Sequence, residues 1–380
     1  MSREDKPAQM TQTAKELFAL LGLGIESTHV SDKRHESLLT LSIKQWKDVV
    51  ALAEIQGVAA IAFDGVQRLY EGYGKEIKAA GEAPSEWLQW VFECTGIMTQ
   101  YEQRCQKQRR AISELSDIWA EEGIRTMIFK GQANAALYPE PGHRATGDID
   151  CFLFGQAERG DTVLRERNAG IDNRWYRHSK ITYMGETIEN HRVMSHTRGG
   201  KKRKEMEEEL KGMIDPTELN TIEGCGKALM PTTMFNACFL TYHALHHFIS
   251  EGLRMKQIVD WAVFLQKEQE QVDWPCLVDF CKRYKLDRFM EVMNYIAVQH
   301  LGVTPTVKDM PMNGYYAEKI LQSTLYEDDY LFNSGKSDWA VRWQLVRNML
   351  TNDRWKYRDI AQENVYKHLW QNIIGFLEKD

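Results

Sequence analysis

The stretch FKGQANAALYPEPGHRATGDIDCFLF, residues 129–154, decides the fold. It continues the β-rich run IRTMIF of residues 124–129, and its two apolar blocks flank a loop rich in Pro and Gly. Short apolar runs bounded by such turn residues are typical of buried strands. The pattern therefore predicts a strand, a short helix, a loop and a second strand, which begins at Gly147-Asp148-Ile149-Asp150.

Further strand-like patterns follow this stretch. Alternating and β-branched residues near 175–183 and 187–194 predict two more strands, and the apolar spacing near 161–167 predicts a helix between them and the first pair. Residues 124–195 therefore fit a compact α+β unit with a small mixed sheet.

Both flanks of this unit carry the three- and four-residue apolar spacing of helices. The spacing occurs near 11–70, in a long helix from Ser85 as N-cap to near Gly123, and again from about residue 230 onward. We therefore expect three units. These are an N-terminal helical region at 1–122, an α+β core at 123–215 and a C-terminal helical domain at 216–380.

Composition limits the classes of protein to consider. Hydrophobic residues make up 43% and charged residues 27% of the 380 residues, which is typical of globular proteins. A net charge of -6 lacks the basic surface that long nucleic acids need. The start MSREDKPAQM has no apolar signal region, and no stretch approaches the roughly 20 apolar residues of a membrane span. We expect a cytoplasmic protein with free, buried Cys thiols and with neither long nucleic acid nor membrane as a partner.

The motif GDID places two acids where a metal can use them. Alternate residues of a strand share a face, so Asp148 and Asp150 project together while Ile149 points to the opposite side. Mg²⁺ prefers oxygen ligands and commonly takes one or two carboxylates with phosphate oxygens and water. Without a cation the two carboxylates repel each other, so neutralising either one is expected to be neutral or stabilising. A lone pair of this kind is usually just two exposed acids, and its context decides.

The residues before the second strand suit a phosphate group. Gly131 after an apolar strand lets the backbone approach a phosphate closely, and the helix that begins there favours anions at its N-terminus. Lys130 and Arg144 carry charge that neutralises a triphosphate. An ordinary turn and solvated basic side chains explain each feature alone, whereas their combination with GDID points to a nucleotide.

The block at 129–154 resembles the uncharacterised nucleotidyltransferases of the NTP_transf_5 type, within the DNA polymerase β-like nucleotidyltransferase superfamily. Lys-Gly, Tyr-Pro, Arg and Asp-Ile-Asp occur in the family's order, and IENHR, YHALHHF and IVDWA are similar to its later features. The resemblance spans about residues 40–265. It implies a small mixed sheet, two Mg²⁺ ions held by three carboxylates, and attack of an acceptor on the nucleotide α-phosphate with loss of pyrophosphate.

The resemblance also implies a set of site residues. The catalytic and metal-binding carboxylates are Asp148, Asp150 and Glu189, with Mg²⁺ or Mn²⁺ as the cation, and we expect Glu189 within roughly 8 Å of the Asp pair. An NTP, with ATP as the leading candidate, is the substrate, and the acceptor is an unidentified small molecule or protein side chain. The implied nucleotide-binding residues are Lys130, Gly131, Gln132, Arg144, Gly147 and His191.

Two positions depart from the family pattern. Gln132 follows Gly131 where the superfamily commonly has Ser or Gly, and Asn190 lies where an apolar, sheet-facing residue is expected between Glu189 and His191. These departures leave a second hypothesis open, a catalytically inactive nucleotide-binding or interaction protein on the same fold.

A His-rich helix supplies a third hypothesis. His243 and His247 are four residues apart and face the same side of a helix, with His246 beside them and Asp260 in the next helix. Helical metal sites use this spacing, so a metal phosphohydrolase using His243, His247 and Asp260 is an alternative. Polar residues that line an interdomain groove, or that contact the acceptor at a second site, are the other interpretations.

The segment HTRGGKKRKEMEEELKG, residues 196–212, separates the α+β core from the C-terminal helices. Five of its basic residues, Arg198, Lys201, Lys202, Arg203 and Lys204, precede a run of Glu. Such a segment is either solvated and self-paired or a phosphate-binding patch.

Overall fold

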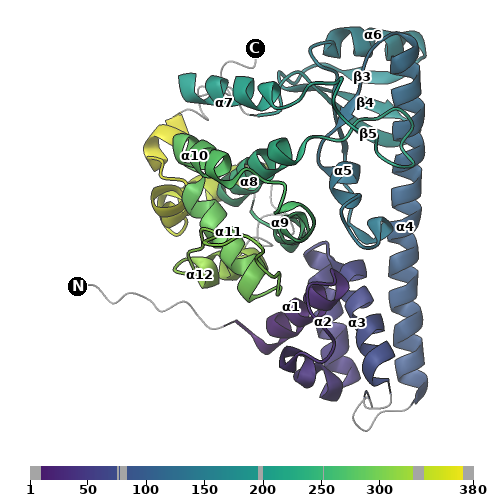
Figure 1. Cartoon of the computed structure of the whole chain (residues 1–380), viewed down its shortest axis with the longest axis vertical. Helices are drawn as coiled ribbons and strands as arrows, with labels where there is room; N and C mark the ends of the chain where they lie inside the picture. The colour runs from purple at the N-terminus through teal and green to yellow at the C-terminus, as the bar shows by residue number, and fades with distance from the viewer. Residues whose placement is uncertain are drawn as a thin grey trace.

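The computed structural model of the chain describes residues 10–74, 77, 84–195, 200–250, 252–327 and 338–370. Its strands all lie within the window 124–195 that the sequence pattern predicts, and helices fill both flanks. The predicted α+β class is confirmed. Figure 1 shows the sheet at one end of a long helix, the N-terminal helices at its other end, and the C-terminal helices beside both.

One five-stranded mixed sheet forms the centre of the α+β unit, in the order β1-β2-β5-β4-β3. The central pair, β2 and β5, is parallel, and the other three pairs are antiparallel. The short edge strand β3 was not predicted, because its three half-exposed residues show no apolar alternation. The strands are β1 (Met127–Ile128), β2 (Ile149–Phe152), β3 (Gly170–Asp172), β4 (His178–Tyr183) and β5 (Glu186–His191).

The register gives the sheet one apolar face and one polar face. Asp150 pairs with Glu189 and Cys151 with Asn190 across β2 and β5, and cross-strand partners point to the same side. The apolar face, which includes Ile149 and Ile188, packs in a hydrophobic cluster with α4 (Pro84–Glu121) and α6 (Ala157–Glu166). The polar face, which carries Asp150 and Glu189, is therefore free to form a site.

The helix α4 connects the two ends of the molecule (Figure 1). Its 38 residues, at 1.5 Å each, make it about 57 Å long. Near its start Trp87 and Trp90 pack on Trp46, with ring centroids 6.0 and 5.5 Å apart. Near its end Trp119 packs in the core of the sheet. One helix thus contributes to both hydrophobic clusters.

The N-terminal helices pack closely because two glycines allow it. A Cβ added at Gly24 would lie 2.0 Å from the carbonyl oxygen of Ile61, and one at Gly65 would lie 2.1 Å from that of Leu20. The backbones of the first and third helices therefore touch, which no larger residue permits. These elements are α1 (Gln12–Gly24), η1 (Lys33–Thr40), α2 (Ile43–Ile55) and α3 (Ala59–Tyr73).

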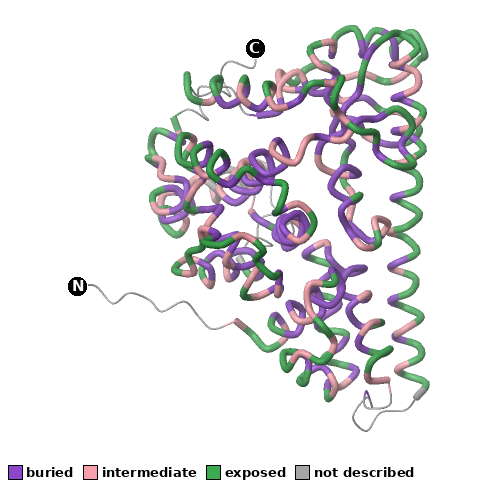
Figure 2. The backbone as a smooth tube through the Cα atoms, viewed as in Figure 1, coloured by how far each residue is buried: buried purple, intermediate pink, exposed green. Residues whose placement is uncertain are grey.

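The C-terminal helices surround α9, which is buried along most of its length (Figure 2). The segment predicted as either solvated or phosphate-binding forms the helix α7, whereas Arg198 lies outside the described residues. The elements are α7 (Lys201–Gly212), α8 (Thr233–Ser250), α9 (Met255–Glu268), α10 (Trp274–Tyr284), α11 (Asp287–Gln299), α12 (Ala317–Gln322), η3 (Ser323–Glu327), α14 (Asp338–Leu350) and η4 (Lys356–Ile360).

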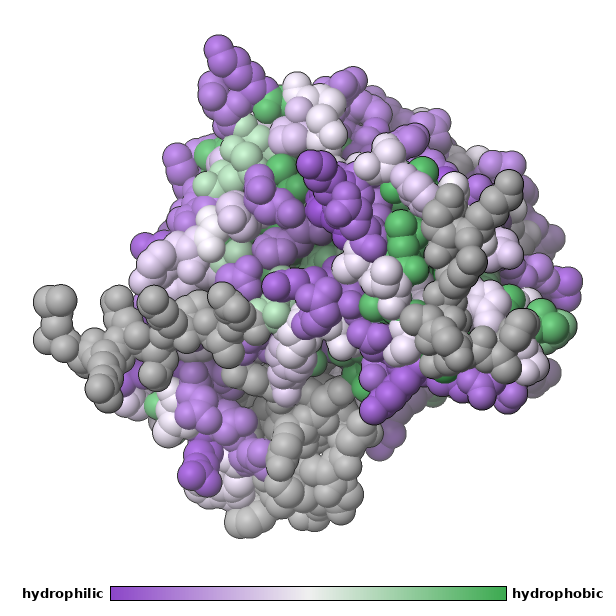
Figure 3. Space-filling model, turned by 90° about the horizontal axis from the view of Figure 1, so that it is seen from below, coloured by the Kyte–Doolittle hydropathy of each residue, from purple (hydrophilic) through white to green (hydrophobic). Residues whose placement is uncertain are grey.

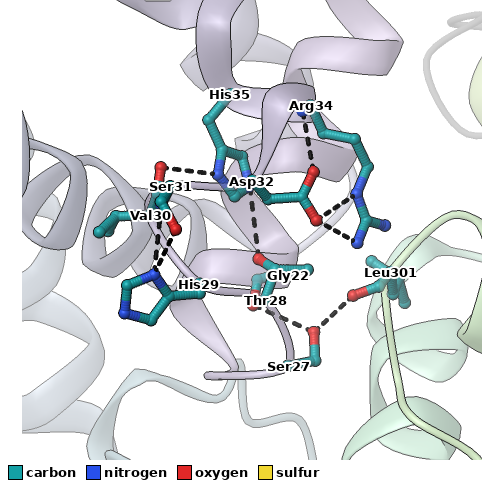
Figure 4. A network of polar contacts seen from close by, with 10 residues as sticks. All are labelled: Gly22, Ser27, Thr28, His29, Val30, Ser31, Asp32, Arg34, His35 and Leu301. Carbon is teal, nitrogen blue, oxygen red and sulfur yellow. Dashed lines mark hydrogen bonds and ion pairs between the residues drawn. The ribbon is translucent and has the colours of Figure 1, made fainter.

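The N-terminal and C-terminal helices share one hydrophobic cluster, which includes Leu17 of α1 and Phe264 of α9. Polar contacts join them as well: in the loop after α1, the Ser27 hydroxyl donates to the carbonyl of Leu301 (Figure 4). The same loop is braced by Asp32, which accepts hydrogen bonds from the backbone and side chain of Arg34. The described residues therefore form two large hydrophobic clusters, whereas three units were expected. The boundaries of the three units stay a prediction.

The surface is that of a polar globular protein. Figure 3 shows one face on which hydrophilic residues cover most of the described surface and hydrophobic residues occur in small groups. No described helix combines the length and apolarity that a bilayer crossing requires. The cysteines are free thiols as predicted, and all are buried except Cys276.

Candidate active site

A cavity of about 430 Å³ opens between the polar face of the sheet and the helices α8 and α9. Most of the site residues predicted from sequence line it, although they come from strands, turns and helices far apart in the chain. Gln132 and His191 do not line it. The predicted residues in the lining are Lys130, Gly131, Arg144, Gly147, Asp148, Asp150, Glu189, His243, His247 and Asp260.

Two side chains contact the carboxylate of Asp150, those of Lys130 and His191. Its Oδ1 lies 2.6 Å from Lys130 Nζ and accepts a hydrogen bond from His191 Nε2 at 2.9 Å. Burial raises the pKa of Asp150, but the charges of Lys130 and His191 outweigh burial and hold this pKa well below its usual value. The expectation that a metal-free Asp150 suffers from repulsion is therefore wrong, because Lys130 already neutralises it. His191, which also contacts the carbonyl of Val193, orients Asp150 instead of lining the cavity.

Lys130 reaches Asp150 because of an unusual turn. Lys130 and Gly131 both have positive φ, 68° and 47°, between β1 and α5 (Gly131–Ala135). With ψ -162°, Lys130 lies in a backbone region that is essentially restricted to glycine and costs about 1–3 kcal/mol, so the surrounding structure must hold it there. The helix that follows has only five residues, so its N-terminus is a weaker anion site than expected and Lys130 supplies most of the positive charge.

Asp148 has a different environment. It precedes β2, is exposed, and has no cationic partner at salt-bridge distance among the described residues. Burial of part of the carboxyl and the negative charge of Glu189 raise the pKa of Asp148. The expected repulsion between carboxylates therefore holds at this position, and a bound cation would relieve it.

Glu189 lies between two histidines on neighbouring strands. Its Oε1 is 3.3 Å from His178 Nε2 and its Oε2 is 3.5 Å from His191 Nε2, while Lys180 is 3.4 Å away. Burial raises the pKa of Glu189, but the contact with His191 and the nearby charges lower it overall, to about 2. Burial lowers the pKa of His178 to about 4, so this imidazole is neutral at pH 7. Sequence reasoning missed His178, although HSKITY places it and Lys180 on one strand face.

The residues present fit a divalent cation. Among the described residues, His178, Glu189 and His191 each offer a ligand atom within 4.8 Å of the others. The separations of 3.3 and 3.5 Å exceed those of charge-assisted hydrogen bonds and are close to the roughly 3.4 Å between ligands of a tetrahedral ion with ~2.1 Å bonds. Both ring nitrogens of His178 are buried without a hydrogen bond. With Asp148 and Asp150, the site offers hard oxygen ligands next to nitrogen ligands.

Arg144 has a different partner from the expected triphosphate. Its guanidinium donates two hydrogen bonds of 2.7 Å to the two carboxylate oxygens of Asp260. Tyr138 and Asn134 donate to the same carboxylate at 2.7 and 3.3 Å. The pair is buried, so the charge of Arg144 is already neutralised and Arg144 positions the loop of the motif. Lys256, in the first turn of α9, lines the cavity, although the sequence analysis did not single it out. Burial and the charge of Arg144 lower the pKa of Lys256.

The histidines of α8 form the wall opposite the sheet. Their predicted spacing brings His243 Nε2 and His247 Nε2 within 3.2 Å of each other. Burial and the charge of Lys130 keep the pKa of His243 well below its usual value, so this ring is neutral. The carboxylate of Asp260 is occupied by Arg144, and within the described chain the three-residue metal geometry occurs at His178 and Glu189 instead. The geometry therefore does not favour a phosphohydrolase built on the α8 histidines.

The two departures from the family pattern have structural explanations. The Gln132 side chain is buried against α4, where it accepts from Arg109 and donates to Gln108 at 3.3 Å each. Asn190 points to the opposite face of the sheet and donates to Asp161 Oδ1 at 2.8 Å. The side chain of Gln132 thus does not reach the cavity. In the register that places Glu189 beside Asp150, the Asn190 amide nitrogen has hydrogen-bond partners on the opposite face of the sheet.

The comparison with known families agrees with this geometry. The small mixed sheet carries Asp150 and Glu189 on paired strands, and a lysine from the turn after β1 contacts Asp150. The model of a family described as uncharacterised nucleotidyltransferases matches residues 42–302, more than half of the chain. The chain belongs to this nucleotidyltransferase family. No curated protein and no solved structure matches this chain.

Proposed function

We propose that the protein transfers a nucleotidyl group from an NTP, with ATP as the first candidate, to an acceptor and releases pyrophosphate. The observation that supports this proposal is the convergence of Asp148, Asp150 and Glu189, with Lys130, on one cavity of about 430 Å³. Asp148, Asp150 and Glu189 are the residues that would hold Mg²⁺ or Mn²⁺. When bound, such ions stabilise the attacking and leaving oxygens of an in-line displacement.

The other residues of the cavity bind and orient the nucleotide. Lys130 and Lys256 face the cavity from the sheet and from α9, so both can approach the phosphates. The buried pair of Arg144 and Asp260 fixes the loop that leads to Asp148, and His191 fixes the carboxylate of Asp150. Catalysis by this arrangement consists mainly of positioning and electrostatic stabilisation.

The test is transfer of label from α-³²P NTPs. The protein is incubated with each labelled NTP, Mg²⁺ or Mn²⁺ and a cell extract, and protein, small-molecule and RNA products are separated. We expect label from the α-position in a small-molecule or protein product, together with pyrophosphate, and no transfer by Asp148→Asn. Transfer of γ-³²P label instead would show phosphoryl transfer. Binding of ATP without consumption in every extract would favour the inactive nucleotide-binding protein.

Metal preference provides a prediction for His178. Because nitrogen ligands suit Mn²⁺ better than Mg²⁺, His178→Gln should weaken Mn²⁺ binding by about tenfold and change Mg²⁺ binding little. Electron paramagnetic resonance of free Mn²⁺ measures the affinity without nucleotide, and Mg²⁺ is measured by competition. The exposed His29→Gln is the control. An equal decrease in the affinities for Mn²⁺ and Mg²⁺ would mean that His178 supports the fold of the site and is not a metal ligand.

A further inference from the structure

A second cavity, of about 420 Å³, lies on the other side of α8 from the candidate active site. Elements from four parts of the chain line it: α7, α8, the turn after α10, and residues 361–368. Its lining has a strong excess of positive charge in a chain whose net charge is -6. Among the described residues, its lining contains one carboxylate, that of Glu363, whereas the cationic residues are Lys201, Lys202, Arg203, Arg283, Lys285 and Lys367.

Three of these cations form no salt bridge within the part of the chain that the structure describes. Lys202 Nζ donates to the carbonyl of Arg283 at 3.3 Å, and Lys285 Nζ donates to the carbonyl of Gln362 at 2.7 Å. Within the described ranges, neither these two ammonium groups nor that of Lys367 forms an ion pair with a carboxylate. Three positive charges from three elements thus meet at one cavity, where the carboxylate of Glu363, which pairs with Arg203, only partly offsets them.

The backbone around Lys285 adds a second observation. Lys285 ends α10 in the left-handed conformation, with φ 61° and ψ 38°. Helices usually place glycine at such a position, because a Cβ is unfavourable there. A lysine is therefore present at some expense of stability. The first turn of α7 also carries positive charge where it is unfavourable. It contains basic residues and no acidic ones, whereas the helix dipole favours acidic residues at this end.

The rest of the cavity is apolar. Met206, Leu245 and Leu286 are buried beneath the cations and contribute hydrocarbon surface to the lining. Apolar walls with a few convergent charges are typical of sites for small organic ligands. A ligand that fits has an anionic group and an apolar ring or chain.

The second cavity adjoins the first. Tyr242 and His246 line both, and their rings stack one helical turn apart on α8, with centroids 6.2 Å apart and planes at 14°. The two cavities therefore share the part of their walls that Tyr242 and His246 form, so a ligand that extends past these rings from the second cavity would enter the first.

We propose that the second cavity binds an anionic small molecule, with a phosphate or carboxylate group and an apolar part, and that this molecule is the nucleotidyl acceptor. The second half of the proposal rests on the proposed function. An acceptor oxygen would form a bond to the α-phosphorus of the NTP, the bond from that phosphorus to the bridging oxygen would break, and pyrophosphate would leave with the electron pair. The proton of the acceptor passes to solvent.

The binding half is tested with 1-anilinonaphthalene-8-sulfonate, a fluorescent anion with an apolar ring system. The triple variant Lys202→Gln, Lys285→Gly, Lys367→Gln should bind it at least about tenfold more weakly at low salt, where electrostatic attraction is strong. The Lys285→Gly change relieves the strained position, so the fold should persist, which a thermal melt checks. The matched control changes three exposed lysines elsewhere by the same charge, namely Lys44→Gln, Lys267→Gln and Lys308→Gln. Equal binding by the triple variant and the control would overturn the site.

The acceptor half is tested with the small-molecule fraction of a cell extract and α-³²P NTP. The triple variant should transfer label at least about tenfold more slowly at low acceptor concentration, with NTP binding unchanged. Unchanged transfer, despite lost probe binding, would overturn the acceptor assignment and leave the proposed function intact. Absence of transfer by the wild type, with normal probe binding, would remove the proposed function and the acceptor role together while the anion site stands. Label found only in RNA would overturn the proposal that the acceptor is a small molecule.

Discussion

Asp150→Asn should reduce nucleotidyl transfer by about 10³-fold and also destabilise the metal-free protein. The loss of activity follows from removal of one of the carboxylates proposed to hold the cation. The loss of stability follows from the contacts of Asp150 with Lys130 and His191, since breaking a buried ion pair leaves an uncompensated charge. We expect a decrease of about 3 kcal/mol in the free energy of unfolding.

Asp148→Asn is the matched control, because it changes the same charge two residues away. It should abolish transfer equally but leave the metal-free stability unchanged or slightly higher, since burial and Glu189 already disfavour the ionised form of Asp148. Urea unfolding in chelator-treated buffer measures both free energies. Equal stability of the two variants would contradict the contact between Lys130 and Asp150. Transfer by Asp150→Asn at a rate close to that of the wild type would contradict its role as a metal ligand.

Asp260→Ala should lower the free energy of unfolding by about 3–5 kcal/mol, the largest effect on stability that we expect from one substitution at the site. The variant leaves the buried guanidinium of Arg144 without its carboxylate and leaves the Tyr138 hydroxyl without its acceptor. Because Arg144 fixes the loop before the Asp-Ile-Asp motif, transfer should fall as well. Urea unfolding followed by tryptophan fluorescence measures the change.

The control for Asp260 is a double variant. Arg144→Met with Asp260→Leu removes both charges, so it should be much less destabilised than either single variant. If the decrease in the free energy of unfolding of the double variant equals the sum of the decreases of the two single variants, the two residues act independently. Arg144 would then be available for the phosphates, as the sequence pattern indicates.

The local parts of the site could be predicted from sequence, and the long-range parts could not. Asp148 and Asp150 were predicted from strand alternation and a short motif, and Glu189 from the family resemblance; their roles as metal ligands stay a prediction. The partnership of Arg144 with Asp260 joins residues 116 positions apart, and no local pattern records it. The contact of Lys130 with Asp150 depends on a positive-φ turn that a lysine rarely adopts.

The same distinction applies to the fold. The helical flanks and the four strands with alternating or continuous apolar residues were predicted, whereas β3 has too few buried residues to leave a pattern. His178 was missed because one histidine in a polar strand carries no signal until its antiparallel partner, His191, is known. The shared core of the N-terminal and C-terminal helices was missed because amphipathic spacing indicates a buried face but not its partner.

The position of α4 has a consequence for how this chain could be divided or inherited. Ile112, Leu115 and Trp119 supply one side of the sheet's core, although they precede the first strand and belong to a helix rooted among the N-terminal helices. A gene fragment that begins at the first strand would therefore encode a sheet with an uncovered apolar face. Recombination that exchanges the five-stranded sheet between relatives would have to carry α4 with it, so the smallest transferable piece of this chain begins well upstream of its Asp-Ile-Asp motif.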